Sequence, residues 1–173
     1  MTVCKNTNTW GDCKSYIKFL PENLPEIDSS YTVTKAYFYV KTKKQATIAA
    51  SVLVKEVSAD WTDSSITWNN APSLGSKGLD YAYIDNVYNE PLTNPAEKWY
   101  SYDISNLVRK WYKGTNYGLA LESMNNTYIL LYTSNYAYAK PYVLINYVSF
   151  AGLEDSLAYE QADAGRAGTG YVG

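Results

Sequence analysis

Hydrophobic and polar residues alternate along most of the chain, the pattern of strands that bury one face. Residues 32–42 (TVTKAYFYVKT) show it most clearly, and one parity is held by Ala36, Phe38 and Val40. The opposite parity is held by Lys35, Tyr37, Tyr39 and Lys41. Because successive side chains of a strand point to opposite faces, we expect the first set in the core and the second on the outer face.

Further strands are predicted at near-regular spacing, separated by clusters of Asn, Asp, Gly, Pro and Ser. The segments are residues 15–19, 47–57, 99–104, 117–123, 128–134 and 141–150. Many short strands joined by turns indicate an all-β fold, an antiparallel β-sandwich or jelly roll.

One segment has helical rather than strand periodicity. In SNLVRKWYKG (105–114), Leu107, Val108 and Trp111 form an apolar stripe, and Gly114 follows as a stop. Asp103 or Ser105 can cap its first turn. We therefore predict one short helix across an end of the sandwich.

The chain has 173 residues, enough for one domain with a sizeable core. From Gly152 onward it is rich in Gly, Ala and acidic residues and has no sustained pattern. The sequence predicts a β-sandwich module over residues 1–150 and a linker or flexible tail over 151–173.

Composition excludes several functions. A net charge of −2 and the absence of clustered Lys and Arg argue against nucleic-acid binding, and no apolar stretch is long enough to span a membrane. The chain has no histidine, the commonest general base and metal ligand. Carboxylates lie in turns or near strand ends, where they usually cap backbone groups. We therefore predict a protein that is not an enzyme. We also predict no cofactor, since oxygen-rich turns such as 59–63 and 85–90 lack a calcium-loop spacing.

The two cysteines lie on either side of a hairpin-like turn, NTNTWGD. If residues 8 and 9 form its tip, Cys4 and Cys13 face each other across two strands, and a disulfide can form. Two buried, reduced cysteines acting as small hydrophobic residues are the alternative.

Aromatic residues supply the candidate binding site. The chain has 19 tyrosines and five tryptophans, and aromatic faces stack on the C–H surfaces of sugars. The candidate contacts are Tyr37, Tyr39, Lys35, Lys41, Trp10 and Trp99. The lysines among them would favour an acidic polysaccharide. In each case packing against cross-strand neighbours is the alternative role.

Four stretches, in this order, resemble the bacterial DNRLRE-type β-sandwich domain: KSYIKFLPENLP, ADWTDSSITWNNAP, WYSYDISNLVRKWYKGTNYGLALES and KPYVLINY. The resemblance covers about residues 15–147, although the name-giving hexapeptide is absent. It implies a jelly-roll-like, non-catalytic module of secreted or wall-associated proteins, and some relatives are similar to carbohydrate-binding modules. The tail from Gly152 resembles the segment that joins such domains to RHS-repeat regions.

The resemblance also implies a role for SITWNNAP (65–72), which recurs in the family as a corner that defines the fold. Thr67, Asn69 and Asn70 can satisfy turn amides, and Pro72 fixes the exit. Trp61 and Trp68 are predicted to cover the open end of the sandwich, so Trp68 is not a candidate ligand contact.

The family usually carries another extended segment before the position of Met1. A missing strand would leave an open edge, which the TGYVG segment (169–173) of a neighbouring chain could fill by strand addition. Two hypotheses follow. The leading one is an extracellular or cell-wall-associated module that binds polysaccharide within a longer protein. The alternative is a spacer or assembly domain of a surface protein with no ligand of its own.

Overall fold

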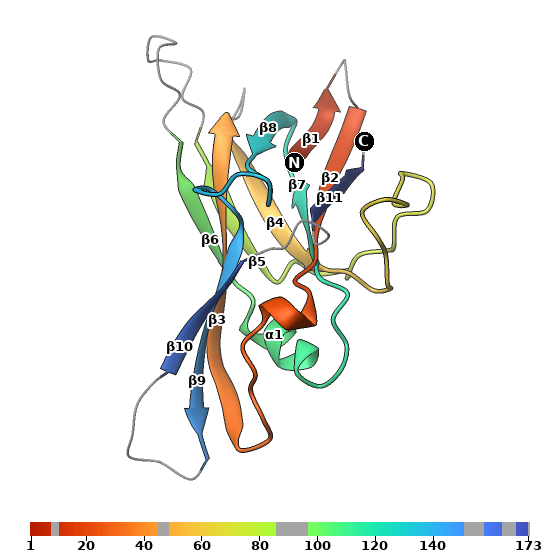
Figure 1. Cartoon of the computed structure of the whole chain (residues 1–173). Helices are drawn as coiled ribbons and strands as arrows, with labels where there is room; N and C mark the ends of the chain where they lie inside the picture. The colour runs from red at the N-terminus through yellow and green to blue at the C-terminus, as the bar shows by residue number, and fades with distance from the viewer. Residues whose placement is uncertain (8–10, 45–48, 86–96, 151–157, 164–168, 173) are drawn as a thin grey trace.

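A computed structural model describes residues 1–7, 11–44, 49–85, 97–150, 158–163 and 169–172. Over these residues it contains eleven strands, one α-helix and one 3-10 turn (Figure 1). The strands are β1 (Thr2–Thr7), β2 (Gly11–Ile17), β3 (Tyr31–Lys44), β4 (Ala50–Glu56), β5 (Asp80–Ile84), β6 (Trp99–Asp103), β7 (Leu119–Ser123), β8 (Thr127–Leu131), β9 (Tyr142–Ser149), β10 (Ala158–Asp163) and β11 (Thr169–Val172). The helix α1 is Ser105–Trp111 and the turn is Pro21–Asn23.

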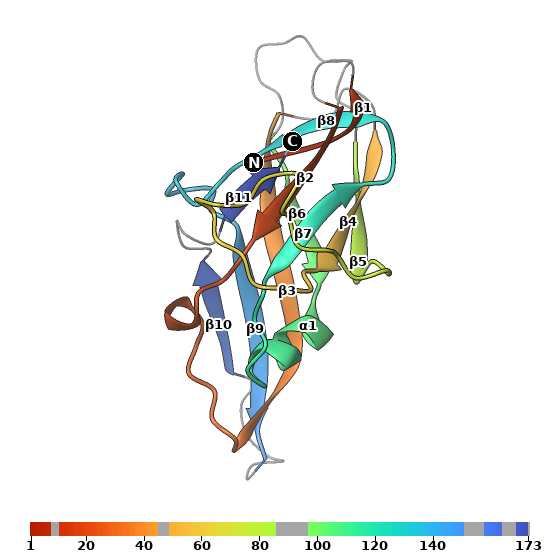
Figure 2. The ribbon, with the colours of Figure 1, turned by 90° about the vertical axis from the view of Figure 1, so that its right-hand side faces the viewer.

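Every strand pairing is antiparallel, in the order β10-β9-β3-β8-β1-β2-β7-β4-β5. Two further strands branch from this path, β6 beside β3 and β11 beside β2, both antiparallel. The sheet curls on itself, and the two views at right angles show α1 near one end of the curl (Figures 1 and 2). The prediction of an antiparallel, mostly β fold with one short helix is thus confirmed.

The long strand β3 confirms the predicted alternation. Ala36, Phe38 and Val40 are each 0% exposed. Phe38 stacks on Tyr102 of β6, with ring centroids 5.9 Å apart, and meets Phe19 edge-on at 6.1 Å. Large side chains from distant segments therefore meet inside the curl, which fixes β3 with its opposite parity facing outward.

The helix forms where the apolar stripe predicts it. Leu107, Val108 and Trp111 are buried, and Gly114 follows the helix with a φ of 102°, a value that favours glycine. The Asp103 carboxylate accepts hydrogen bonds from the Ser105 N–H and hydroxyl, at 2.9 and 2.5 Å. These two bonds join the end of β6 directly to α1, while the N-cap residue, Ile104, makes no side-chain capping bond.

Cys4 of β1 and Cys13 of β2 are register partners and form a disulfide, with their Cα atoms 4.7 Å apart. The structure therefore has the cross-strand bond, one of the two alternatives left open by the sequence.

Two strands occur within the segment after residue 150. The backbone of β10 pairs with β9, and the backbone of β11 pairs with β2 of the same chain. Figure 1 shows β11 beside β2, close to the N-terminus. The segment expected to add to a neighbouring chain is thus paired within its own chain. The domain boundary near residue 150 stays a prediction.

Candidate functional site

An aromatic surface lies on the outer side of β6, β3 and β9. We call its five residues the aromatic face: Tyr39, Lys41, Trp99, Tyr132 and Tyr142. Strand register brings them together, because Lys41 is the partner of Trp99 and Tyr39 is the partner of Tyr142. The Tyr39 and Tyr142 rings stack with centroids 4.8 Å apart and an angle of 12°. Trp99 meets Tyr142 edge-on at 5.4 Å.

Polar groups border the rings at one end of this face. The Lys41 ammonium lies 2.6 Å from Glu97 Oε2 and 5.7 Å from the centroid of the Tyr132 ring. The Tyr132 hydroxyl donates to the other oxygen of Glu97. Hydrogen bonds from Lys41 and Tyr132 lower the pKa of Glu97, and the bond to Glu97 raises the pKa of Tyr132. At neutral pH the face therefore offers a carboxylate, an ammonium and a phenol within one cluster.

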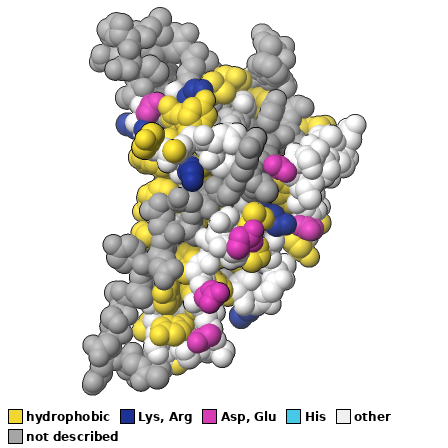
Figure 3. Space-filling model, in the orientation of Figure 1, with side chains coloured by type: hydrophobic (Ala, Val, Ile, Leu, Met, Phe, Trp, Pro, Cys, Tyr) yellow, Lys and Arg dark blue, Asp and Glu magenta, His cyan; other side chains and the backbone are white. Residues whose placement is uncertain are grey.

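The face is open to solvent. Trp99 is 42% exposed, Tyr39, Lys41, Tyr132 and Tyr142 are partly exposed, and neighbouring Tyr136 is 44% exposed. Figure 3 shows hydrophobic side chains, tyrosines included, gathered along the left margin of the molecule, with basic and acidic groups beside them. Because Tyr39, Trp99 and Tyr142 stand on paired strands, the positions of these three rings are fixed before any ligand arrives.

The sequence predicted three of the five residues, Tyr39, Lys41 and Trp99. Of the other candidates, Tyr37 and Lys35 follow along the same face of β3, as the alternation requires. Tyr37 is partly exposed, and Lys35 lies 2.9 Å from Asp103 in an ion pair. Trp10 lies outside the described residues. The structure thus brings half of the candidate set into one cluster.

Tyr132 and Tyr142 were not among the residues predicted from the sequence. In residues 142–146 the buried Val143 and Ile145 alternate with Tyr142, so parity alone could have placed Tyr142 on the outer face. Tyr132 lies just beyond the end of β8, where it reaches Lys41 because the two chain segments adjoin. No alternation in the sequence indicates that contact.

The SITWNNAP segment behaves differently from the prediction at Trp68. Asn70 closes the turn as expected: its Oδ1 accepts from the Thr67 N–H at 2.5 Å, and its Nδ2 donates to the Ser65 carbonyl at 2.8 Å. Trp61 is buried, 7% exposed, and its indole N–H donates to the Tyr117 carbonyl. Trp68, by contrast, is 49% exposed. It stands in the surface turn that Asn70 stabilises, so it does not cover an end of the fold.

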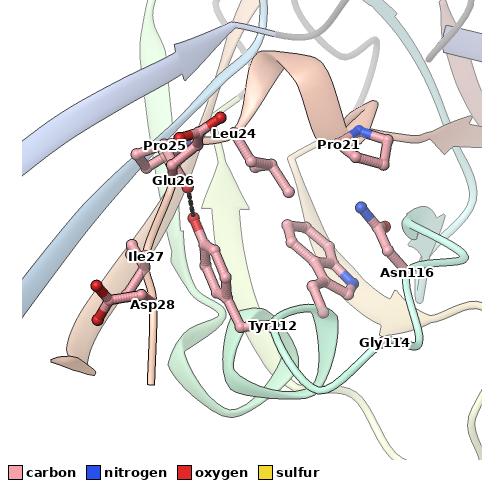
Figure 4. Close-up of a pocket in the computed structure, with 10 residues that line it drawn as sticks. Pro21, Leu24, Pro25, Glu26, Ile27, Asp28, Tyr112, Gly114 and Asn116 are labelled. Atoms are coloured by element: carbon pink, nitrogen blue, oxygen red, sulfur yellow. Dashed lines mark hydrogen bonds between the residues drawn. The ribbon is translucent and has the colours of Figure 1, made fainter. Parts of the chain in front are cut away.

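A hollow of about 640 Å³ lies between residues 21–28 and the C-terminal end of α1 (Figure 4). Its aromatic residues hold the fold together. Trp111 is buried and packs on Phe19, with ring centroids 5.8 Å apart. The Tyr112 hydroxyl donates to the Pro25 carbonyl at 2.9 Å, the dashed line in Figure 4. The hollow therefore presents little open ring surface for stacking.

The residues that the structure describes contain no cluster of three or more His, Cys, Asp or Glu side chains arranged to hold a metal ion. Within the same ranges, no helix is both long and apolar enough to cross a membrane.

Comparison with known proteins gives one match. The family model of carbohydrate-binding module family 96 matches residues 1–147, which include the whole aromatic face. No curated protein and no solved structure matches the chain.

Proposed function

The chain belongs to carbohydrate-binding module family 96, and from this premise we propose that it binds a polysaccharide at the aromatic face without catalysing a reaction on it. The stacked pair of Tyr39 and Tyr142 with Trp99 at its edge carries the proposal. Family membership supports carbohydrate as the ligand class, and the choice of this face is our own inference.

The chemistry of the face suits a sugar ring. The C–H surface of a pyranose packs on an aromatic ring, and its hydroxyls need partners that both donate and accept. The Lys41 ammonium has protons left to donate to a sugar, whereas Glu97 and the Tyr132 hydroxyl, whose proton is given to Glu97, have lone pairs left to accept. An open face on strands, rather than an enclosed cavity, suits a chain that extends beyond it at both ends.

The charges of the face change one expectation. Lys41 is paired with Glu97, and Lys35 is paired with Asp103. Each ammonium is therefore balanced by a carboxylate, which weakens the preference for an acidic polysaccharide that the lysines alone indicate. Both neutral and acidic polysaccharides belong in the test.

We propose that the module is part of a secreted or cell-surface protein, as the DNRLRE and RHS resemblances imply. We also propose that its curled sheet is a jelly-roll-like sandwich. Side-chain contacts between residues 80–85 and 98–103 support this proposal. Asp80 accepts a hydrogen bond from the Asp103 N–H at 2.7 Å, and Asp85 lies 3.3 Å from the Lys98 ammonium.

A spacer or assembly domain is the rival function. Size-exclusion chromatography tests it, because an assembling domain should elute as concentration-dependent oligomers.

Affinity gel electrophoresis tests the binding proposal. The purified chain is run through gels that contain a β-glucan, xylan, galactomannan or polygalacturonate. We expect at least one polysaccharide to retard the chain, and Trp99→Ala or Tyr39→Ala to weaken the affinity roughly tenfold, about 1.4 kcal/mol. Tyr37→Ala, farther along the same face, should have a smaller effect.

Tyr31→Ala is the matched control. Tyr31 is an exposed tyrosine on the same strand, eight residues from Tyr39, and its ring packs on Tyr147. The Tyr31→Ala variant should be retarded as strongly as the wild type. No retardation of the wild type by any polysaccharide of the panel would overturn the proposed function. Retardation that is undiminished in both Trp99→Ala and Tyr39→Ala would keep the function and remove this face from it.

A further inference from the structure

The groove beside Trp68 has the parts of a separate sugar-binding site. It lies on the outer side of β2, β7 and β4 and has a volume of about 460 Å³, within the range of small-ligand sites. The Trp68 groove comprises Lys14, Lys55, Trp68, Glu122 and the loop 71–76. The five residues of the aromatic face are not part of its lining.

The charged residues of this groove form one connected network. Glu122 Oε1 lies 2.9 Å from the Lys14 ammonium, and Glu122 Oε2 lies 2.6 Å from the Lys55 ammonium. The three side chains are between 17% and 28% exposed. Burial by itself raises the pKa of Glu122, but hydrogen bonds from Lys55 and Lys14 outweigh burial and lower it. The network therefore stays ionised, with two ammonium donors around one carboxylate acceptor.

The indole of Trp68 is held in place and left open. Lys14 Nζ lies over the indole, 5.8 Å from the ring centroid, so the ammonium that pairs with Glu122 also makes a cation–π contact with Trp68. The backbone that carries Trp68 is fixed by Asn70 on one side, and Pro72 accepts a hydrogen bond from the Tyr16 hydroxyl at 3.1 Å on the other. The half-exposed indole therefore leaves ring surface on which a sugar can pack.

We propose that the Trp68 groove is a second carbohydrate contact of this module, in which one pyranose ring packs on Trp68 and its hydroxyls bind Lys14, Glu122 and Lys55. The proposal rests on the proposed function, because the same class of ligand occupies both sites. It makes the module bivalent, with the two sites on different strands of the curled sheet.

Stoichiometry tests this inference directly. An oligosaccharide is prepared from the polysaccharide that retards the wild type, short enough to occupy one site, and is titrated into the full chain by calorimetry. We expect two oligosaccharides per chain for the wild type. Trp68→Ala and Trp99→Ala should each leave one site of wild-type affinity and weaken the other roughly tenfold, and the double variant should leave no site of wild-type affinity.

Conservative variants separate ligand contact from structure. Trp68→Phe should retain part of the second binding event because a flat ring remains, whereas Lys55→Gln should weaken it through lost donors. Circular dichroism and thermal unfolding of each variant show whether the chain still folds.

The outcomes distinguish the two proposals. One oligosaccharide per wild-type chain, lost in Trp99→Ala and unchanged in Trp68→Ala, overturns the second site and leaves the proposed function intact. One per chain, lost in Trp68→Ala and unchanged in Trp99→Ala, supports the groove and overturns the aromatic face as the site. If none of the polysaccharides retards the wild type, both the proposed function and the second site are overturned.

Discussion

The aromatic face and the Trp68 groove use the same residue types in opposite ways. On the aromatic face, rings pack on rings, and Lys41 with Glu97 lies at the border. In the groove, the ion network lies among the strands, and the single exposed ring stands on a loop beside it. Strand alternation places four of the five residues of the face, with Tyr132 just beyond the end of β8, whereas the groove also needs a loop that holds Trp68 beside the strands.

This difference predicts different weaknesses. Tyr39 stands on β3, whose inner residues Ala36, Phe38 and Val40 are fully buried. Trp99 and Tyr142 stand on the two strands paired with β3, so local changes should move these rings little. Trp68 depends on the contacts that hold residues 58–73 against the sheet. The groove should therefore fail first when those contacts are removed.

Trp61→Ala is expected to have the largest effect. It removes a buried indole and its hydrogen bond to the Tyr117 carbonyl, so the free energy of unfolding should fall by about 3 kcal/mol. The loop that carries Trp68 should loosen, and oligosaccharide binding in the groove should fall more than binding at the aromatic face. Urea unfolding followed by calorimetric titration checks both parts.

The control for this prediction is Trp68→Ala, seven residues along the same segment. Because Trp68 is half exposed, its loss should change stability by less than about 1 kcal/mol. Equal destabilisation by the two variants would contradict the division into an anchoring and an exposed tryptophan.

Removal of residues 151–173 should have an intermediate effect on both surfaces. The strand β10 pairs with β9, where Asp163 is the partner of Tyr142, and β11 pairs with β2, where Val172 is the partner of Lys14. The tail thus lies along a supporting strand of each surface. Truncation should lower the free energy of unfolding by about 1–3 kcal/mol, given the usual stability per residue.

Thermal unfolding of the truncated chain beside the full chain checks this. Proline at Gln161 or at Tyr171 serves as the matched pair of variants, because each interrupts one of the two tail strands within the full chain. An unchanged melting temperature after truncation would instead support a domain boundary near residue 150.

Strand parity explains most of what could be predicted from the sequence. The alternation around Phe38 and the stripe of α1 identify elements and buried faces, because both depend only on local spacing. The same parity placed Tyr39, Lys41 and Trp99 on the outer faces of their own strands, and only the pairing of β3 with β6 brings them together. The outward position of Tyr142 could have been inferred from the alternation of β9. Its register with Tyr39, however, depends on how distant strands pair.

The Trp68 groove could not be predicted in this way. Trp61 and Trp68 have similar polar neighbours, and local sequence does not indicate that one indole reaches the Tyr117 carbonyl while the other faces solvent. The Lys14–Glu122–Lys55 network combines residues from three strands, so it exists only once the sheet has assembled. Nor does composition indicate that the tail pairs with β9 and β2, since its residues lack an apolar pattern.

Acid titration should give the smallest effect and compares the two surfaces through their carboxylates. Burial by itself raises the pKa of Asp103, beside the aromatic face, but hydrogen bonds from Ser105 and Lys35 outweigh burial and lower it from 3.8 to about 2. The folded chain therefore favours the ionised form. Its contribution to stability is present above pH 3.8 and is lost as the pH falls towards 2.

Asp103→Asn removes that contribution. Because the Asp103 side chain is 38% exposed, solvent screening limits the expected loss to under about 1 kcal/mol at neutral pH. The difference from wild type should shrink towards zero near pH 2, measured by urea unfolding at several pH values. Glu122→Gln in the groove should show the same trend, since the pKa of Glu122 is also lowered, and should also weaken oligosaccharide binding there. A stability difference for Asp103→Asn that stays constant from pH 5 to pH 2 would show that the charge of Asp103 does not stabilise the fold beside the aromatic face.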